Sequence, residues 1–306
     1  MSIYIWLGFL AFVFLMLIVD LGIFNRNAHV IKIKEALIWS AVWVSLSLIF
    51  CYGIYYFLGK EKSLEFLTGY LIEKSLSIDN LFVFIMLFSF FNINPRYQHK
   101  VLFWGILGAL VMRGIFIFAG VALINKLHWI IYIFGAFLIF TGIKMLIQKE
   151  VKVKPEKNPL VRLFKKFMPV ATEMHGGKFF VKINARAFAT PLFIALIVIE
   201  FSDLIFAVDS IPAILAISND TFIIFTSNVF AILGLRAMYF ALAGITEYFY
   251  YLKYGLSLIL LFVGTKMSIS SFQIIPMEYS LLIIVSVLII CILISVVFPQ
   301  KNKSRK

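Results

Sequence analysis

The sequence predicts an all-α, polytopic membrane protein, and three observations support this prediction. Hydrophobic residues make up 62% of the 306-residue chain, whereas charged residues make up 14% and the mean hydropathy is +1.01. A soluble domain carries about 25% charged residues, so this composition indicates a chain that lies in a bilayer. The apolar residues form stretches of about 20 residues, the length of a helix that crosses a membrane. Spanning segments must satisfy their backbone hydrogen bonds internally, so we expect helices.

About nine transmembrane helices are expected, because nine apolar stretches have the required length. In chain order they cover residues 3–24, 34–58, 63–90, 98–122, 127–148, 187–217, 221–245, 251–270 and 276–298. Residues 1–62 therefore hold the first two helices, and residues 271–306 hold the last helix and a basic tail. A long basic loop covers residues 149–186.

Positive charge is distributed unevenly between the two sides of the predicted helices. Twenty Lys and Arg residues fall on one side, ten of them within 149–186, whereas the other side holds three, Lys60, Lys62 and Lys126. Because basic loops remain in the cytoplasm, we expect the N-terminus outside and the C-terminus inside. The net charge of +13 therefore belongs to inner loops, and a nucleic-acid partner is not expected. The basic loop could contact anionic lipid or a cytosolic partner.

Two of the apolar stretches carry the same polar pattern. In the first, Glu73 is followed by Asp79 and Asn80; in the second, Asp203 is followed at the same spacing by Asp209. A carboxylate at the centre of a bilayer costs at least ~2.5–3.5 kcal/mol by insertion scales. A pattern that incurs this cost twice indicates a functional site.

The chain after each pattern carries further matches in the same order. Arg113 follows Asp79 by 34 residues and Gly142 follows Arg113 by 29, while Arg236 and Gly264 follow the second pattern at spacings of 27 and 28. The matches predict an internal repeat of three helices in each half.

The two predicted units, residues 63–148 and 187–270, enter the membrane from opposite sides. Inverted repeats of this kind are typical of alternating-access transporters, in which the substrate binds between the repeats near the membrane centre. Duplication without transport is the alternative.

Acidic residues outnumber basic ones inside the predicted spans. The acids are Asp20, Glu73, Asp79, Glu200, Asp203 and Asp209, and the bases at similar depth are Lys74, Arg113 and Arg236. Excess negative charge suits a cation, and oxygen ligands such as carboxylates and Asn80 suit hard divalent ions: Mn²⁺, Mg²⁺ or Ca²⁺. We expect the ion as a transported substrate, without a tightly bound cofactor, and the three bases as countercharges or gating groups. Asp20, near the end of its span, could equally be an interfacial acid.

Helix geometry places Glu73 and Asn80 on one face, because seven residues make nearly two turns. Asp209 falls away from the corresponding face of its own helix. Pro212 removes a hydrogen bond to the carbonyl of Val208, so we predict a helix break at 206–208 that turns Asp209 inward. Freed carbonyls at this break would add ligands.

Three segments, EKSLSIDNLFVF (73–84), EFSDLIFAVDSIPAI (200–214) and NVFAILGLRAMYF (228–240), resemble signature segments of the TerC family of integral membrane proteins. The resemblance implies a multi-span protein of the bacterial inner membrane, linked with tellurium resistance and, in Alx-like members, with manganese export. It also implies kinship with LysE-type exporters, which share an inverted three-helix repeat. Carried over by motif, the metal residues are Glu73, Asp79 and Asn80 in one repeat and Glu200, Asp203 and Asp209 in the other.

These observations favour a secondary transporter that exports a divalent metal, Mn²⁺ above all, in exchange for protons. Tellurite is an anion that the acidic core would repel, so an effect on tellurite is expected to be indirect. One alternative is a non-transporting membrane subunit of a tellurium or envelope-stress response complex. Another is an intramembrane hydrolase with paired aspartates, but no Gly-x-Gly-Asp motif flanks Asp79 or Asp209. No GxxxxGK[ST] loop is present, so an ATPase, and an enzyme in general, is not expected.

Overall fold

The structure is a computed structural model of the whole chain. It describes residues 3–22, 33–127, 129–147, 168–171, 176–183, 186–243, 251–270 and 275–297. The backbones of Asp20, Asp79 and Asp209 belong to helices, but their side chains lie outside the described part of the structure. The basic loop predicted for residues 149–186 also lies largely outside the described residues.

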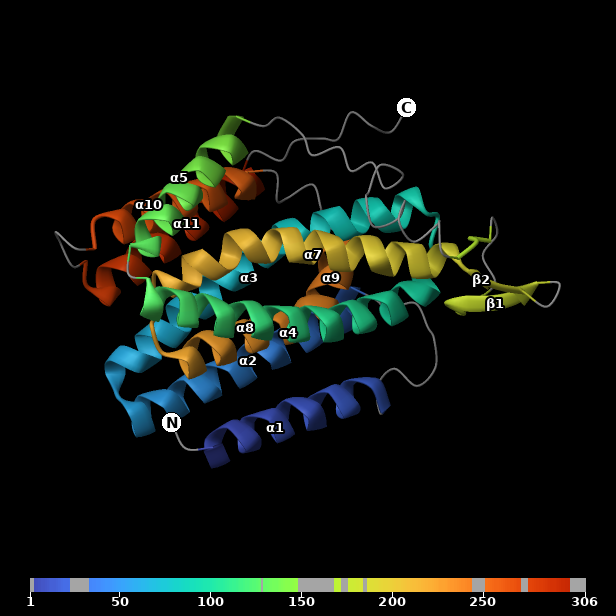
Figure 1. The fold of residues 1–306 in the computed structure, drawn as a ribbon, viewed down its shortest axis with the longest axis horizontal. Coiled ribbons are helices and arrows are strands. Elements are labelled where there is room, and N and C mark those ends of the chain that lie inside the picture. The colour runs from blue at the N-terminus through green and yellow to red at the C-terminus, as the bar shows by residue number, and fades with distance from the viewer. Residues whose placement is uncertain are drawn as a thin grey trace.

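Helices account for most of the described chain (Figure 1). The first five are α1 Ile3–Gly22, α2 Ile33–Leu58, α3 Lys60–Phe90, α4 Pro95–Lys126 and α5 Ile130–Ile147. The others are α7 Pro191–Leu215, α8 Thr221–Leu233, α9 Leu235–Ala243, α10 Leu252–Ser268 and α11 Met277–Val297.

Every predicted span coincides with a helix, or, for 221–245, with the pair α8 and α9. Six segments of the described chain, namely α2, α4, α5, α7, α8–α9 and α11, are long and apolar enough to cross a membrane. The chain is thus an all-α, multi-pass membrane protein, as predicted. The number of nine spans stays a prediction.

A short hairpin precedes α7. Strand β1 (Phe180–Ile183) pairs antiparallel with β2 (Arg186–Ala189), and Phe180 lies opposite Ala189. In Figure 1 the hairpin projects beyond one end of the helix bundle. The sixth span, predicted to begin at residue 187, therefore begins later, because residues 187–189 belong to β2 and Pro191 provides the first turn of α7.

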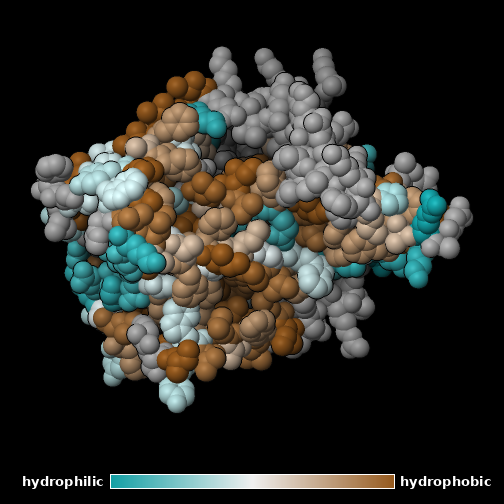
Figure 2. Space-filling view, in the orientation of Figure 1, coloured by the Kyte–Doolittle hydropathy of each residue, from teal (hydrophilic) through white to brown (hydrophobic). Residues whose placement is uncertain are grey.

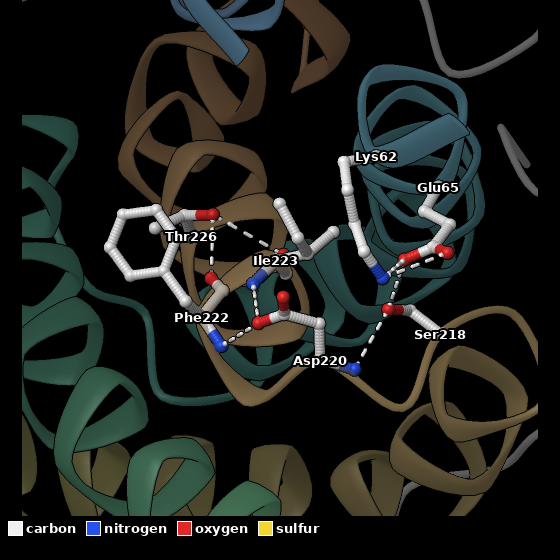
Figure 3. A network of polar contacts seen from close by, with 7 residues as sticks. All are labelled: Lys62, Glu65, Ser218, Asp220, Phe222, Ile223 and Thr226. Carbon is white, nitrogen blue, oxygen red and sulfur yellow. Dashed lines mark hydrogen bonds and ion pairs between the residues drawn. The ribbon is translucent and has the colours of Figure 1, made fainter. Parts of the chain in front are cut away.

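Local sequence explains where several helices begin and end. Gly59, with φ of 91°, makes the turn between α2 and α3 that a residue with a Cβ rarely adopts. The Asn94 side chain accepts a hydrogen bond from the Arg96 amide at the start of α4. The carboxylate of Asp220 accepts bonds from the first amides of α8 (Figure 3). Such N-caps satisfy amides that have no partner within the helix.

The centre of the bundle is formed by α3, α4, α7 and α8. Helix α4 packs against α7 and α8, while α3 packs against α7, α8 and α2. Nearly all residues of α8 are buried, so this helix is surrounded by protein. Helices α5, α10 and α11 form a second group beside the bundle (Figure 1).

Large apolar side chains cover much of the exterior (Figure 2). They are frequent on α1, α2 and α11, where Tyr4, Ile49 and Val297 are each more than 60% exposed. Soluble monomers rarely expose continuous apolar surface of this extent, whereas a lipid-facing surface requires it.

Helices α5 and α10 approach each other through glycines. A Cβ on Gly135 would lie 2.9 Å from the carbonyl oxygen of Gly264, and a Cβ on Gly264 would lie 2.8 Å from the carbonyl oxygen of Gly135. Seven residues further along α5, a Cβ on Gly142 would lie 3.0 Å from the carbonyl oxygen of Ser257 in α10. Glycine is needed here because the two backbones touch, as is common between membrane helices.

The helix break predicted before Pro212 is not found. Helix α7 continues from Pro191 to Leu215 with Pro212 inside it. A proline removes a single backbone hydrogen bond, here the one to the carbonyl of Val208, and the other hydrogen bonds of α7 continue the helix through this position. In the second predicted repeat, the helical segment that is interrupted is the predicted span 221–245. The interruption lies at Gly234, which separates α8 from α9.

Candidate metal site

Arg113 occupies the centre of the candidate site. It comes from the middle of α4 and is 1% exposed. Its Nε donates to Asp203 Oδ2 over 3.2 Å, and its Nη2 donates to Asp203 Oδ1 over 3.0 Å. Its Nη1 forms an ion pair with Glu73 Oε1. One guanidinium thus holds an acid from α3 and an acid from α7, and the geometry with Asp203 is the two-bond form that Arg prefers.

The two acids held by Arg113 are the first residues of the two repeated patterns. Glu73 and Asp203 are 0% and 3% exposed, so both carboxylates lie in the protein interior. Two carboxylates against one guanidinium leave one negative charge in excess when both are ionised. Such an imbalance favours binding of a further cation or a proton.

Asn228 completes the group and was missed in the sequence. Its Oδ1 accepts a bond of 3.2 Å from Arg113 Nη1, and the residue is 1% exposed in α8. The sequence signal for Asn228 is an amide side chain within segment 221–233, which is otherwise apolar except for Thr and Ser residues. On α3, Ser77 donates a bond of 3.3 Å to Glu73 Oε1.

Three buried polar atoms of this region have no hydrogen-bond partner among the described residues: Glu73 Oε2, Ser210 Oγ and Asn228 Nδ2. Buried polar atoms normally form hydrogen bonds, because a buried donor or acceptor without a partner costs about 1–3 kcal/mol. The free oxygens of Glu73 and Ser210 are of the kind that bind hard cations. The site therefore offers ligand capacity that Arg113 leaves unused.

Glu200 lies one turn before Asp203 on α7, and Arg236 of α9 lines a cavity together with Asp203. The carboxylate of Glu200 packs directly over Gly108 of α4, where a Cβ would collide with both of its oxygens. Arg236, 7% exposed, is the second residue of α9, just after the interruption at Gly234. Arg236 and Asp203 line a cavity of about 10 Å³ between α3, α4, α7 and α9, enough for roughly one water molecule.

Lys74, which was predicted to be a countercharge or gating group, contacts the end of α8. Its Nζ donates a bond of 3.2 Å to the carbonyl of Ala231 in the last turn of α8. A Cβ on Gly234 would lie 2.6 Å from this ammonium, so Gly234 leaves the space that the lysine fills. A cation at a helix C-terminus satisfies carbonyls that lack partners and interacts favourably with the helix dipole.

The structure thus brings together Glu73, Asp203 and Arg113 of the predicted site. Asn80 is buried, 3% exposed, on the same helix as Glu73. Within the described side chains, no three His, Cys, Asp or Glu residues gather closely enough to hold a metal ion. The predicted ligands Asp20, Asp79 and Asp209 lie outside this set, so their part in the site stays a prediction.

Comparison with known proteins identifies the family. The family model described as "Integral membrane protein TerC family" matches residues 58–304. The chain belongs to the TerC family. The matched residues include all of the central bundle helices α3, α4, α7 and α8.

Several curated proteins resemble nearly the whole chain. An "Uncharacterized membrane protein STKORF319" of Myxococcus xanthus is 55% identical over 93% of this chain and 89% of its own length. A protein of Escherichia coli K12 named "Putative membrane-bound redox modulator Alx" is 48% identical over 95% of this chain and 94% of its own length. An "Uncharacterized membrane protein" of Rickettsia bellii is 44% identical over 97% and 98%. No solved structure matches the chain.

Proposed function

We propose that this TerC-family protein is a secondary transporter that exports a divalent metal cation, with Mn²⁺ as the favoured ion, across the bacterial inner membrane in exchange for protons. The observation that carries the proposal is the shared guanidinium of Arg113. It bridges Glu73 of α3 and Asp203 of α7 in the interior of a membrane protein. Buried ionisable residues at such a position mark ion pathways in membrane proteins.

Arg113 would act as the cation of the empty site. A buried carboxylate without a partner is strongly unfavourable, so the acids need a positive charge whenever the metal is absent. When a divalent cation arrives, Glu73 and Asp203 can bind it through oxygens that Arg113 now holds. Carboxylates bind metal in the ionised form, and therefore proton binding and metal binding oppose each other. This opposition is the basis of the proposed proton exchange.

Alternating access would use the predicted inverted repeats, and contacts between α5 and α10 support this arrangement. Gly135 and Ser257 each lie seven residues before the matched glycines Gly142 and Gly264. Gly135 touches Gly264, and Gly142 touches Ser257. Reciprocal contacts of this kind are what a two-fold axis relating two copies imposes. With the N-terminus outside, the turn between α2 and α3 would face the exterior and the β-hairpin the cytoplasm.

Dithiol redox chemistry, suggested by the name of the Escherichia coli relative, is supported less well. The sequence has two cysteines, Cys51 in α2 and Cys291 in α11, and both are buried and free. Cys51 is hydrogen-bonded to Ser63, with its sulfur 3.2 Å from the hydroxyl oxygen. Buried thiols in apolar surroundings are usually inert.

The test is metal flux through the purified protein in proteoliposomes, with Mn²⁺ on one side and a pH gradient across the bilayer. We expect Mn²⁺ movement with wild type and little with Glu73→Gln or Asp203→Asn. Glu278→Gln is the matched control, because Glu278 is an exposed acid that pairs with Lys60 at the surface. Absence of flux from folded wild-type protein would contradict transport and favour the alternative of a membrane subunit of a stress-response complex.

A further inference from the structure

A second polar contact lies at the end of the bundle where α3 begins, away from the Arg113 group (Figure 3). Lys62 Nζ bonds to both carboxylate oxygens of Glu65, over 3.1 and 2.9 Å. Ser218, in the loop after α7, donates to Glu65 Oε2 over 2.5 Å and accepts a bond of 3.1 Å from the Asp220 amide. We call Lys62, Glu65 and Ser218 the end clamp.

The end clamp joins the two predicted repeats. Glu65 lies in α3 at the start of the first unit and Lys62 just before that unit on the same helix, while Ser218 connects α7 to α8 in the second unit. The Lys62 side chain is 33% exposed, whereas that of Glu65 is 10% exposed. Ser218 is 5% exposed. The clamp therefore has a solvent-facing side at Lys62 and a protein-facing side at Glu65 and Ser218.

A line of polar and small residues connects the clamp with the Arg113 group. Glu65, Gly69 and Glu73 are spaced by four residues and so lie along one side of α3 over about 12 Å. A Cβ on Gly69 would lie 2.9 Å from Ser227 Oγ of α8, so this hydroxyl fills the space between the two acids. Ser227 is 1% exposed and directly precedes Asn228, which binds Arg113.

We propose that the end clamp is the outer gate of the transporter, which closes a cation route along the α3–α8 seam between the central site and the exterior. The inference rests on the proposed function for its direction and its substrate. Opening separates α3 from the α7–α8 loop by breaking the Ser218–Glu65 bond. Glu65 then presents its carboxylate to the departing cation, which takes the place of Lys62. Ser218 holds Glu65 through one hydrogen bond beside the partly exposed Lys62, whereas Arg113 holds two buried acids, so the Ser218–Glu65 contact opens more readily.

Chemical access to Ser227 tests the gate independently of transport. The chain carries Cys51→Ala, Cys291→Ala and Ser227→Cys, and a positively charged, membrane-impermeant methanethiosulfonate is added to intact cells. We expect slow modification while the clamp is intact. With Ser218→Ala or Glu65→Gln the rate rises about tenfold or more, as expected when a hydrogen bond to a charged group no longer holds the closed state.

Two controls separate the gate from folding and from orientation. Thr226→Ala removes a hydroxyl that, among the described residues, bonds only to carbonyls of its own helix, those of Phe222 and Ile223, and leaves the rate unchanged. Asn219→Cys, in the exposed part of the α7–α8 loop, reacts rapidly from outside whether the clamp is present or not.

The proposal is overturned if both clamp variants leave the rate at Ser227→Cys unchanged, or if Thr226→Ala raises it equally. It is also overturned if Asn219→Cys reacts only in inside-out membranes, since the clamp would then face the cytoplasm. If labelling depends on the clamp but the protein carries no metal flux, the gate is supported and the metal is rejected as the transported substrate.

Discussion

Replacing Arg113 by Met removes the guanidinium from between Glu73 and Asp203 but keeps a side chain of similar length. Wild-type Arg113 donates two hydrogen bonds to Asp203 and one to Asn228, in addition to the ion pair with Glu73. Breaking a buried ion pair by removal of one partner costs about 3–5 kcal/mol. At about 2–4 °C per kcal/mol for a chain of this size class, Tm should fall by about 6–20 °C.

Metal should restore part of the stability of Arg113→Met. A ligand at 100 times its Kd stabilises the folded state by about 2.7 kcal/mol. In the wild type the gain should be smaller, because Mn²⁺ must displace Arg113 before it binds the acids. The assay is thermal unfolding of the purified protein with and without Mn²⁺. Arg96→Met is the control: Arg96 is exposed at the start of the same helix, and its replacement should change stability by no more than about 0.5 kcal/mol.

Neutralising the acids provides the second half of this test. Adding Glu73→Gln and Asp203→Asn to Arg113→Met leaves no uncompensated charge, so most of the lost stability should return while the response to Mn²⁺ disappears. The reasoning is refuted if Arg113→Met is as stable as wild type, or if Mn²⁺ stabilises wild type as strongly as the variant. Either result would mean that Arg113 does not compete with a cation for these carboxylates.

Two glycine variants test the packing around the site. Gly108→Ala would push the Glu200 carboxylate aside, so we expect lower Mn²⁺ flux with nearly unchanged Tm; unchanged flux would exclude a role for this placement. Gly264→Ala would place a Cβ against the backbone of Gly135, and overpacking of this kind costs about 1–3 kcal/mol, measured as a lower Tm. Gly53→Ala is the control for both, since no atom lies within 4 Å of its added Cβ and the change should be neutral or slightly stabilising.

The sequence predicted the helices and the core acids because both depend on simple energetic terms. A helix of about 20 apolar residues is specified by the thickness of the bilayer, so the positions of all the predicted spans agree with helices. The cost of a buried carboxylate identified Glu73 and Asp203, and the mid-span position of Arg113 made it a countercharge. These inferences need no knowledge of which helices are neighbours.

The contacts that the sequence did not predict depend on tertiary neighbours. Asn228 binds Arg113 only because α8 packs between α3 and α4. Lys74 binds the carbonyl of Ala231 because the helix is interrupted at Gly234, and a single glycine in an apolar run does not reveal such an interruption. The predicted break before Pro212 was wrong because a proline removes only one backbone hydrogen bond, and the remaining ones continue α7 through Val208.

The difference in burial between the Arg113 group and the end clamp determines the order in which they can open. Moving Arg113 away from two buried carboxylates costs several kcal/mol unless another cation takes its place, so the central site opens only when an ion enters it. At the end clamp, α3 is held to the α7–α8 loop by the single hydrogen bond from Ser218 to Glu65, beside the partly exposed Lys62. A hydrogen bond to a charged group is worth about 1.5–3 kcal/mol, so it breaks more readily than the Arg113 group. If both contacts were equally weak, ions could leak through the seam. A deeply buried contact that responds to the ion, in series with a weak contact near the surface, allows release without a continuous open path.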